Sequence, residues 1–255
     1  MLTHPIHHKL RSMHLHGMAQ ALQEQLESGN AQMQKMIFEE RLGLMIDREQ
    51  LHRENKGFER RLAYAKLKQR ATLEDLDYAH SRNLDASLVR SLAEGDWLKE
   101  HRSLIVTGST GTGKTYISCA FAHQACRQGF SVLYTQTGRL LQELTIAKAD
   151  GRYLRVLASI ARTQLLILDD WGLESPDAQQ QRILLEILDD RYDKRSTLIA
   201  SQFPTDTWHL KQADPTLADA ILDRVLHNAY RIELGGDSLR KSKKKTTHPS
   251  QSNHR

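Results

Sequence analysis

The chain has 255 residues, of which 39% are hydrophobic and 26% are charged, enough for one large domain, or for one domain with a small accessory region. Its formal net charge of +5 favours polyanions such as nucleic acid, although a soluble protein can be basic without such a partner. No apolar run approaches the roughly 18 residues of a membrane-spanning helix, so no membrane partner is expected.

The two cysteines, Cys119 and Cys126, are seven residues apart on one predicted helix and share a face. Two thiols on one helix face cannot supply four zinc ligands, and a disulfide at this spacing is geometrically unfavourable. Reduced, buried cysteines are typical of a cytosolic protein. The first fifteen residues lack the apolar core of a signal peptide. We therefore expect a cytoplasmic protein.

Residues 1–70 lack strand-like alternation and are predicted to form a helical N-terminal domain that contacts DNA or other subunits. Apolar residues recur at helical spacing from Leu10 to Leu26, and Gly29-Asn30 breaks that run. Two further helical stretches are predicted, one at about 36–46 and one at about 54–69.

Residues 71–240 alternate short apolar runs with helical stretches. The runs predicted to be strands are 103–107, 131–135, 164–168, 197–201 and 230–234. Continuous apolar strands are what a parallel sheet buried on both faces requires. The pattern therefore predicts an α/β fold with a five-stranded, mainly parallel sheet flanked by helices. Residues 241–255 are basic and polar, and we expect this tail to lack fixed structure.

A phosphate-binding pattern, G-x-x-x-x-G-K-[ST], lies between the first predicted strand and the following helix. Its residues, called the phosphate loop below, are Gly108, Ser109, Thr110, Gly111, Thr112, Gly113, Lys114 and Thr115. The glycines let consecutive N–H groups point at phosphate oxygens, and the helix N-terminus adds positive charge. We expect Lys114 to contact the β- and γ-phosphates of ATP and Thr115 to bind Mg²⁺. The alternative interpretation of this glycine-rich segment is a flexible surface loop.

A pair of carboxylates, Asp169 and Asp170, follows the third predicted strand. Sites in α/β proteins assemble at the carboxyl edge of the sheet. Asp169 is expected to hold Mg²⁺ directly or through water, and Asp170 to polarise the attacking water as a general base. Acid pairs also end ordinary strands, but after a phosphate loop this pair predicts ATP hydrolysis.

Several further segments have a recognisable sequence. They are LHGM (15–18), FEERL (38–42), LLILDDWG (165–172), SQFP (201–204), HNAYRIEL (227–234) and GDSLRK (236–241). With the phosphate loop, these segments resemble AAA+ ATPases of the group that contains the helicase loader DnaC, and specifically the IstB-like family of ATP-binding helpers encoded beside bacterial transposases. The resemblance extends from about Leu10 to Lys241, and is therefore more specific than a shared phosphate loop. It implies an AAA+ domain over 71–240.

The resemblance also implies roles for three further residues. Gln202 falls at the sensor-1 position, where a polar side chain helps to place water, although it could simply cap the strand end. Arg224 matches the arginine finger, which acts in the site of a neighbouring subunit; it could instead be an exposed helix arginine paired with a carboxylate. Arg240 occupies a sensor-2-like position beside the nucleotide, or merely begins the basic tail.

A basic stretch with interleaved aromatic residues ends the predicted N-terminal domain. Its candidate DNA contacts are Arg53, Lys56, Arg60, Arg61, Lys66 and Lys68. Such a stripe neutralises phosphates without reading bases, so non-specific binding to double-stranded DNA is expected. A solvated helix face is the alternative interpretation.

Together these features predict an ATP-dependent DNA-binding helper ATPase of an insertion sequence. The resemblance implies a homo-oligomer with ATP sites between subunits, which assembles on DNA and recruits or activates its cognate transposase. A DnaC-like replicative helicase loader is the alternative. A small-molecule P-loop kinase would need an acceptor pocket and a lid, for which no segment is suited. A nucleotide-switched scaffold that barely hydrolyses ATP would not need both Asp169 and Asp170.

Overall fold

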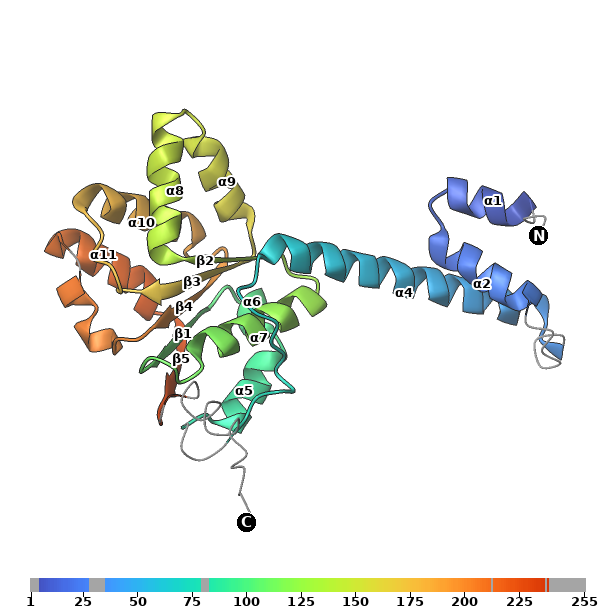
Figure 1. Cartoon of the computed structure of the whole chain (residues 1–255), viewed down its shortest axis with the longest axis horizontal. Helices are drawn as coiled ribbons and strands as arrows, with labels where there is room; N and C mark the ends of the chain where they lie inside the picture. Colours follow the sequence, from blue (N-terminus) through green and yellow to red (C-terminus); the bar gives the residue numbers. More distant parts are fainter. Residues whose placement is uncertain (1–4, 28–34, 79–82, 212, 237, 239–255) are drawn as a thin grey trace, which may run out of the picture. The chain divides into compact units, whose positions relative to one another are not determined.

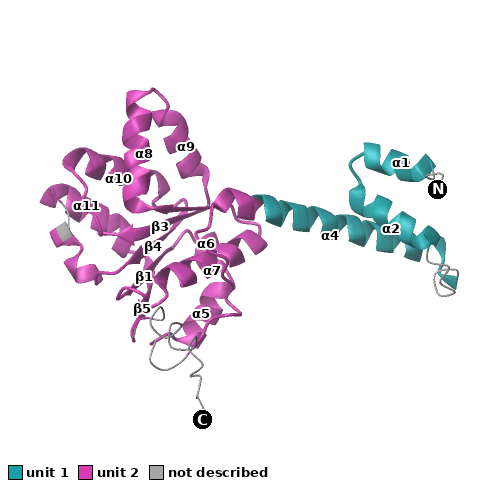
Figure 2. Cartoon of the chain, viewed as in Figure 1, with its two compact units in different colours: residues 1–60 teal, residues 61–255 magenta. Residues whose placement is uncertain are grey.

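The computed structural model describes residues 5–27, 35–78, 83–211, 213–236 and 238 (Figure 1). The chain divides into two compact units, 1–60 and 61–255 (Figure 2). The functional roles expected for the domains 1–70 and 71–240 stay predictions. Arg240 and the basic tail 241–255 lie outside the described residues.

The first unit contains helices α1 (Pro5–Ser12), α2 (His16–Glu27) and α4 (Phe38–Ala65), the last of which continues into the second unit. The run expected to be one helix from Leu10 to Leu26 is divided, because His14 adopts a positive φ of 59° between α1 and α2. The two helices expected over 36–69 are one helix. Residues 46–54 contain no proline or glycine, so helical hydrogen bonds continue through them.

The carboxylate of Glu49, on α4, contacts the N-terminus of α2. It is only 6% exposed and accepts hydrogen bonds from the backbone N–H groups of Gly17 (2.7 Å) and Met18 (3.2 Å), and from Nε of Arg53 (2.7 Å). A Cβ atom on Gly17 would lie 2.5 Å from the carbonyl oxygen of Arg48. A glycine is therefore needed where α2 approaches α4.

The second unit is built on one sheet in the order β2-β3-β4-β1-β5. The strands are β1 (Ser103–Gly108), β2 (Val132–Gln136), β3 (Leu165–Trp171), β4 (Ser196–Ser201) and β5 (Ala229–Leu234). Every neighbouring pair is parallel. The predicted five-stranded α/β fold is confirmed, with strand bounds within a few residues of those expected.

Helices cover both faces of the sheet (Figure 1). They are α5 (Ala86–Ala93), α6 (Asp96–Lys99), α7 (Lys114–Arg127), α8 (Thr137–Ala149), α9 (Tyr153–Arg162), α10 (Ala178–Arg191) and α11 (Pro215–Leu226). The connection between β4 and α11 contains the short 3₁₀ turns Thr205–Thr207 and His209–Lys211. Helix α7 packs on one face, with α5 and α6 beside it, and α8 to α11 lie on the other. None of the described helices combines the length and apolar character that crossing a membrane requires.

Strand direction decides which loops meet. Because all five strands are parallel, β1, β3 and β4 end at the same edge of the sheet. The phosphate loop, Asp169 and Gln202 follow or end these strands and therefore gather at this carboxyl edge. The opposite, amino edge carries the starts of the strands and the C-terminal end of α11, which runs back to β5.

Candidate nucleotide site

The phosphate loop joins β1 to α7, as predicted. Gly111 and Gly113 have φ angles of +89° and +103°, which side chains other than glycine rarely tolerate. The Lys114 ammonium donates hydrogen bonds to the carbonyl oxygens of Gly108 (2.7 Å) and Ser109 (2.9 Å), so the loop curls around it. Helix α7 begins at Lys114 on a glycine N-cap, which leaves its first N–H groups facing the loop.

One hydrogen bond joins the phosphate loop to the third strand. Oγ1 of Thr115 donates to Oδ2 of Asp169 over 2.8 Å. Two more neutral groups donate to the same carboxylate: the Tyr134 hydroxyl to Oδ2 (2.5 Å) and the Asp170 N–H to Oδ1 (2.9 Å). The two residues expected to bind Mg²⁺ are therefore in direct contact.

The chemistry of these donors fits a magnesium ion. Asp169 is 1% exposed, and a buried carboxylate needs compensation for the water that it has lost. Hydroxyl and carboxylate oxygens are the hard ligands that Mg²⁺ prefers, with phosphate oxygens and water completing its coordination. Thr115 and Asp169 are therefore the residues of this chain that could hold the ion.

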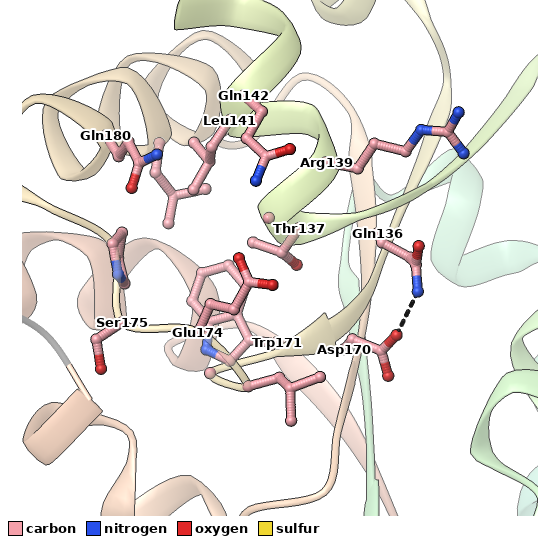
Figure 3. Close-up of a pocket in the computed structure, with 15 residues that line it drawn as sticks. Gln136, Thr137, Arg139, Leu141, Gln142, Asp170, Trp171, Glu174, Ser175 and Gln180 are labelled. Carbon is pink, nitrogen blue, oxygen red and sulfur yellow. Dashed lines mark hydrogen bonds between the residues drawn. The ribbon is translucent and has the colours of Figure 1, made fainter.

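Asp170 sits at an irregularity in β3. The register between β3 and β4 shifts between Leu168 and Trp171, and Asp170 has a positive φ of 57°. Such irregularities often re-aim a side chain beside a site. Here the Asp170 carboxylate is half-buried and accepts a hydrogen bond from Nε2 of Gln136 over 2.7 Å (Figure 3). Nζ of Lys68 lies 4.0 Å from the same oxygen, Oδ2.

A hollow of about 360 Å³ lies beside Asp170 (Figure 3). It is lined by the start of α8, by residues 170–176 and by α10. The indole Nε1 of Trp171 is buried there and has no hydrogen-bond partner among the described residues. No residue of the phosphate loop lines this hollow, so it is distinct from the phosphate site.

Gln202 contacts the phosphate loop, and its sensor-1 role stays a prediction. Oγ1 of Thr110 donates to Oε1 of Gln202 over 2.9 Å. The neighbouring Ser201 is buried and donates to the carbonyl oxygen of Trp171 over 2.8 Å, which fixes the end of β4 to the end of β3. Gln202 is thus held at the carboxyl edge between the phosphate loop and the strand that carries Asp169.

Arg224 lies apart from the phosphate loop of its own chain. It is near the C-terminal end of α11, and together with Ser103 and Thr197, at the starts of β1 and β4, it lines a small hollow at the amino edge. Its Nε is 2.9 Å from Oδ1 of Asp189, and Nη1 is 3.3 Å from Oδ2 of Asp223. Within one chain it is therefore a helix arginine paired with carboxylates.

The predicted DNA contacts of the first unit differ in their surroundings. Arg53 pairs with the buried Glu49 over 2.7 Å, which gives it a structural contact. Lys56 lines a hollow between α2 and α4, and Arg60 is exposed.

The predicted DNA contacts of the second unit also separate. Nε of Arg61 donates to the carbonyl oxygen of Cys126 over 2.8 Å, near the C-terminal end of α7. Lys66 and Lys68 are exposed in the segment that follows α4, and Lys66, with a φ of +53°, ends that helix. Their DNA contacts stay predictions.

Two residues of the site, Tyr134 and Gln136, were not predicted from the sequence. Both lie in β2, and both reach carboxylates at the end of β3. The sequence signal that could have indicated them is their position, because both are polar residues at the end of a predicted strand. The position of β2 beside β3, which gives these groups their partners, could not be inferred from the order of strands in the sequence.

The chain is similar to ATP-binding proteins of insertion sequences along nearly its whole length. A family model described as "IstB-like ATP binding protein" matches residues 8–247. The insertion sequence ATP-binding protein y4pL of Sinorhizobium fredii is 46% identical over 245 residues, which are 96% of this chain and 99% of y4pL. An ATP-binding protein of insertion sequence IS1162 from Pseudomonas fluorescens is 46% identical over 210 residues, 81% of this chain and 89% of that protein.

Solved structures share the fold of the second unit. The crystal structure of DnaI is 26% identical, with a TM-score of 0.56 over 65% of this chain and 91% of DnaI. AMPPCP-bound DnaA from Aquifex aeolicus is 21% identical, with a TM-score of 0.56 over 71% of this chain and 56% of that one. The DnaC helicase loader is 18% identical, with a TM-score of 0.51 over 68% of this chain and 98% of DnaC. The predicted AAA+ fold is confirmed.

Proposed function

Because the chain belongs to the family of IstB-like ATP-binding proteins, we propose that it is an ATP-dependent, DNA-binding helper ATPase of an insertion sequence. In this proposal it assembles on double-stranded DNA as a homo-oligomer and recruits or activates its cognate transposase. The observation that carries the ATPase function is the hydrogen bond between Thr115 and Asp169, because it joins the phosphate loop to the carboxylate expected to hold Mg²⁺.

Each residue of the site then has a chemical role. The loop N–H groups and the first turn of α7 bind the phosphates, and Lys114 exchanges its carbonyl contacts for β- and γ-phosphate oxygens. Mg²⁺, held by Thr115 and Asp169, would supply positive charge to the phosphates. Asp170 accepts a proton from the attacking water, and Gln202 helps to position that water.

The position of Arg224 supports ATP sites between subunits. Its side chain lies at the amino edge of the sheet, whereas the phosphate loop lies at the carboxyl edge. An arginine there cannot reach the phosphates of its own chain, but it can enter the site of a neighbour. In that position a guanidinium would stabilise negative charge on the transferring phosphoryl group.

The helicase loader remains the second candidate, because the similarity to DnaI shares the ATPase unit. The extent of the similarities favours the first candidate. The DnaI match covers 65% of this chain, whereas the match to y4pL covers 96% and includes most of the first unit. We therefore prefer the insertion-sequence function.

Light scattering tests this proposal. We expect the wild-type particle to grow when both a slowly hydrolysed ATP analogue and a 60-base-pair duplex (about 200 Å, at 3.4 Å per base pair) are present. The Lys114→Ala variant should not grow, because it lacks the charge that holds the triphosphate. Adding the cognate transposase should produce a heavier complex only on the wild-type assembly. A particle of constant mass under all conditions would contradict the proposal.

A further inference from the structure

Another hollow, of about 860 Å³, lies along β2, the edge strand of the sheet. It is lined by residues of the segment 64–68, of β2, and of α8 and α9. The hydroxyl groups of Tyr64 and Ser159 are 3.2 Å apart, so the C-terminal end of α4 is tied to α9. We call this hollow the basic groove.

The basic groove carries a large excess of positive charge. Its charged lining residues are Lys66, Lys68, Arg139, Arg155 and Arg162, against the single carboxylate Glu143. All five cations are exposed. In the part of the chain that the structure describes, the side chains of all but Lys68 make neither a salt bridge nor a hydrogen bond. Like charges gathered with so few salt bridges favour an anionic ligand with several charges.

We propose that the basic groove binds the sugar-phosphate backbone of DNA. This step rests on the DNA binding proposed above, and it moves the main contact from the first unit to the ATPase unit. Three of the five cations are arginines, whose planar guanidinium groups bind phosphate through two hydrogen bonds. Tyr64, with 45% of its surface exposed, offers a ring at the groove for contact with a sugar or a base.

The groove also reaches the catalytic carboxylate, through Lys68. Nζ of Lys68 is 4.0 Å from Oδ2 of Asp170, and both side chains are partly exposed, so the pair is weak. Gln136 lines the groove as well and donates to the same oxygen. A phosphate in the groove competes with Asp170 for Lys68.

The binding surface is tested with two double variants of the full chain. Arg155→Ala with Arg162→Ala removes two groove cations. Arg90→Ala with Arg182→Ala removes two exposed arginines, of α5 and α10, that do not line the groove. Binding to a fluorescent 30-base-pair duplex is measured by anisotropy across a salt series, and thermal unfolding confirms that both variants fold.

We expect the groove variant to bind more weakly, with a slope of log affinity against log salt that is shallower by about 1.8, or about 0.9 for each lost contact. The control should keep the wild-type slope. A wild-type slope in the groove variant overturns the inference while leaving DNA binding itself intact. Absence of duplex binding by the wild-type protein overturns both proposals. A groove variant that keeps DNA but loses the transposase would assign the groove to an acidic protein segment instead.

Discussion

The Tyr134 hydroxyl donates to Oδ2 of Asp169 over 2.5 Å, and both side chains are buried at the carboxyl edge of the sheet. The bond crosses from β2 to β3, where Gln136 and Asp169 are register partners. Burial, and then the hydrogen bond to Asp169, raise the pKa of Tyr134 above its ordinary value. The phenol therefore remains a donor at physiological pH and holds the carboxylate that is expected to bind Mg²⁺.

Tyr134→Phe should weaken the response of the enzyme to Mg²⁺. Groups that orient a metal ligand contribute about 10- to 100-fold to metal affinity, so the Mg²⁺ concentration for half-maximal turnover should rise about tenfold. Nucleotide binding measured without Mg²⁺ should stay unchanged, because the phosphate loop is intact. Tyr153→Phe removes a phenol that contacts Glu186 instead, and is the matched control. An unaltered Mg²⁺ requirement would show that Tyr134 does not position Asp169.

Asp170→Asn should abolish most hydrolysis while preserving nucleotide binding. A general base contributes about 100-fold or more to a rate, so single-turnover hydrolysis should slow by at least about 100-fold. Asp193 also has a positive φ, of 54°, and Asp193→Asn makes the same chemical change outside the nucleotide site. That control should hydrolyse ATP at the wild-type rate. Rapid hydrolysis by Asp170→Asn would assign the base elsewhere.

Arg224→Ala should lower turnover by about 1000-fold, which is the lower end of the range of effects for an arginine finger. The affinity for ATP should stay nearly unchanged. The same variant should regain turnover when it is mixed with Lys114→Ala. In such mixtures one subunit supplies an intact phosphate loop and its neighbour supplies the arginine. If mixing restores nothing although both variants assemble, Arg224 acts only through its pairs with Asp189 and Asp223.

Glu49→Gln should loosen α2 from α4 at neutral pH. Burial acts to raise the pKa of Glu49, but the hydrogen bonds from Arg53, Met18 and Gly17 outweigh it and lower the pKa below 4.5. Because the folded-state pKa is lowered, this stabilisation is present above pH 4.5 and is lost as the pH falls through the folded-state pKa. Losing hydrogen bonds to a charged group costs about 1 to 3 kcal/mol.

Hydrogen exchange of the Gly17 and Met18 amides provides the measurement for this substitution. At pH 7 these amides should exchange faster in Glu49→Gln than in the wild-type protein. Once the different intrinsic exchange rates are taken into account, the difference should vanish under acidic conditions, where Glu49 is protonated. Glu54→Gln, on the exposed side of α4, is the control. Equal protection at pH 7 would mean that Glu49 does not hold the two helices together.

Elements whose signals are contiguous in the chain could be predicted from the amino-acid sequence. The phosphate loop could be identified because its glycines, Lys114 and Thr115 are adjacent and follow an apolar strand. Asp169 was recognised because it directly ends another such strand. The helix boundaries in the first unit could not be predicted as well. The helical spacing of apolar residues over 10–26 does not reveal that His14 adopts a left-handed backbone conformation.

The contacts between these elements depend on how the chain packs in three dimensions. The strand order places β2 beside β3, and so brings Tyr134 to Asp169 and Gln136 to Asp170. It also places Arg224 at the edge opposite the phosphate loop. Local periodicity reports which face of a strand is buried. It does not report which strand lies alongside, because that depends on the crossover connections and on packing between residues far apart in the chain.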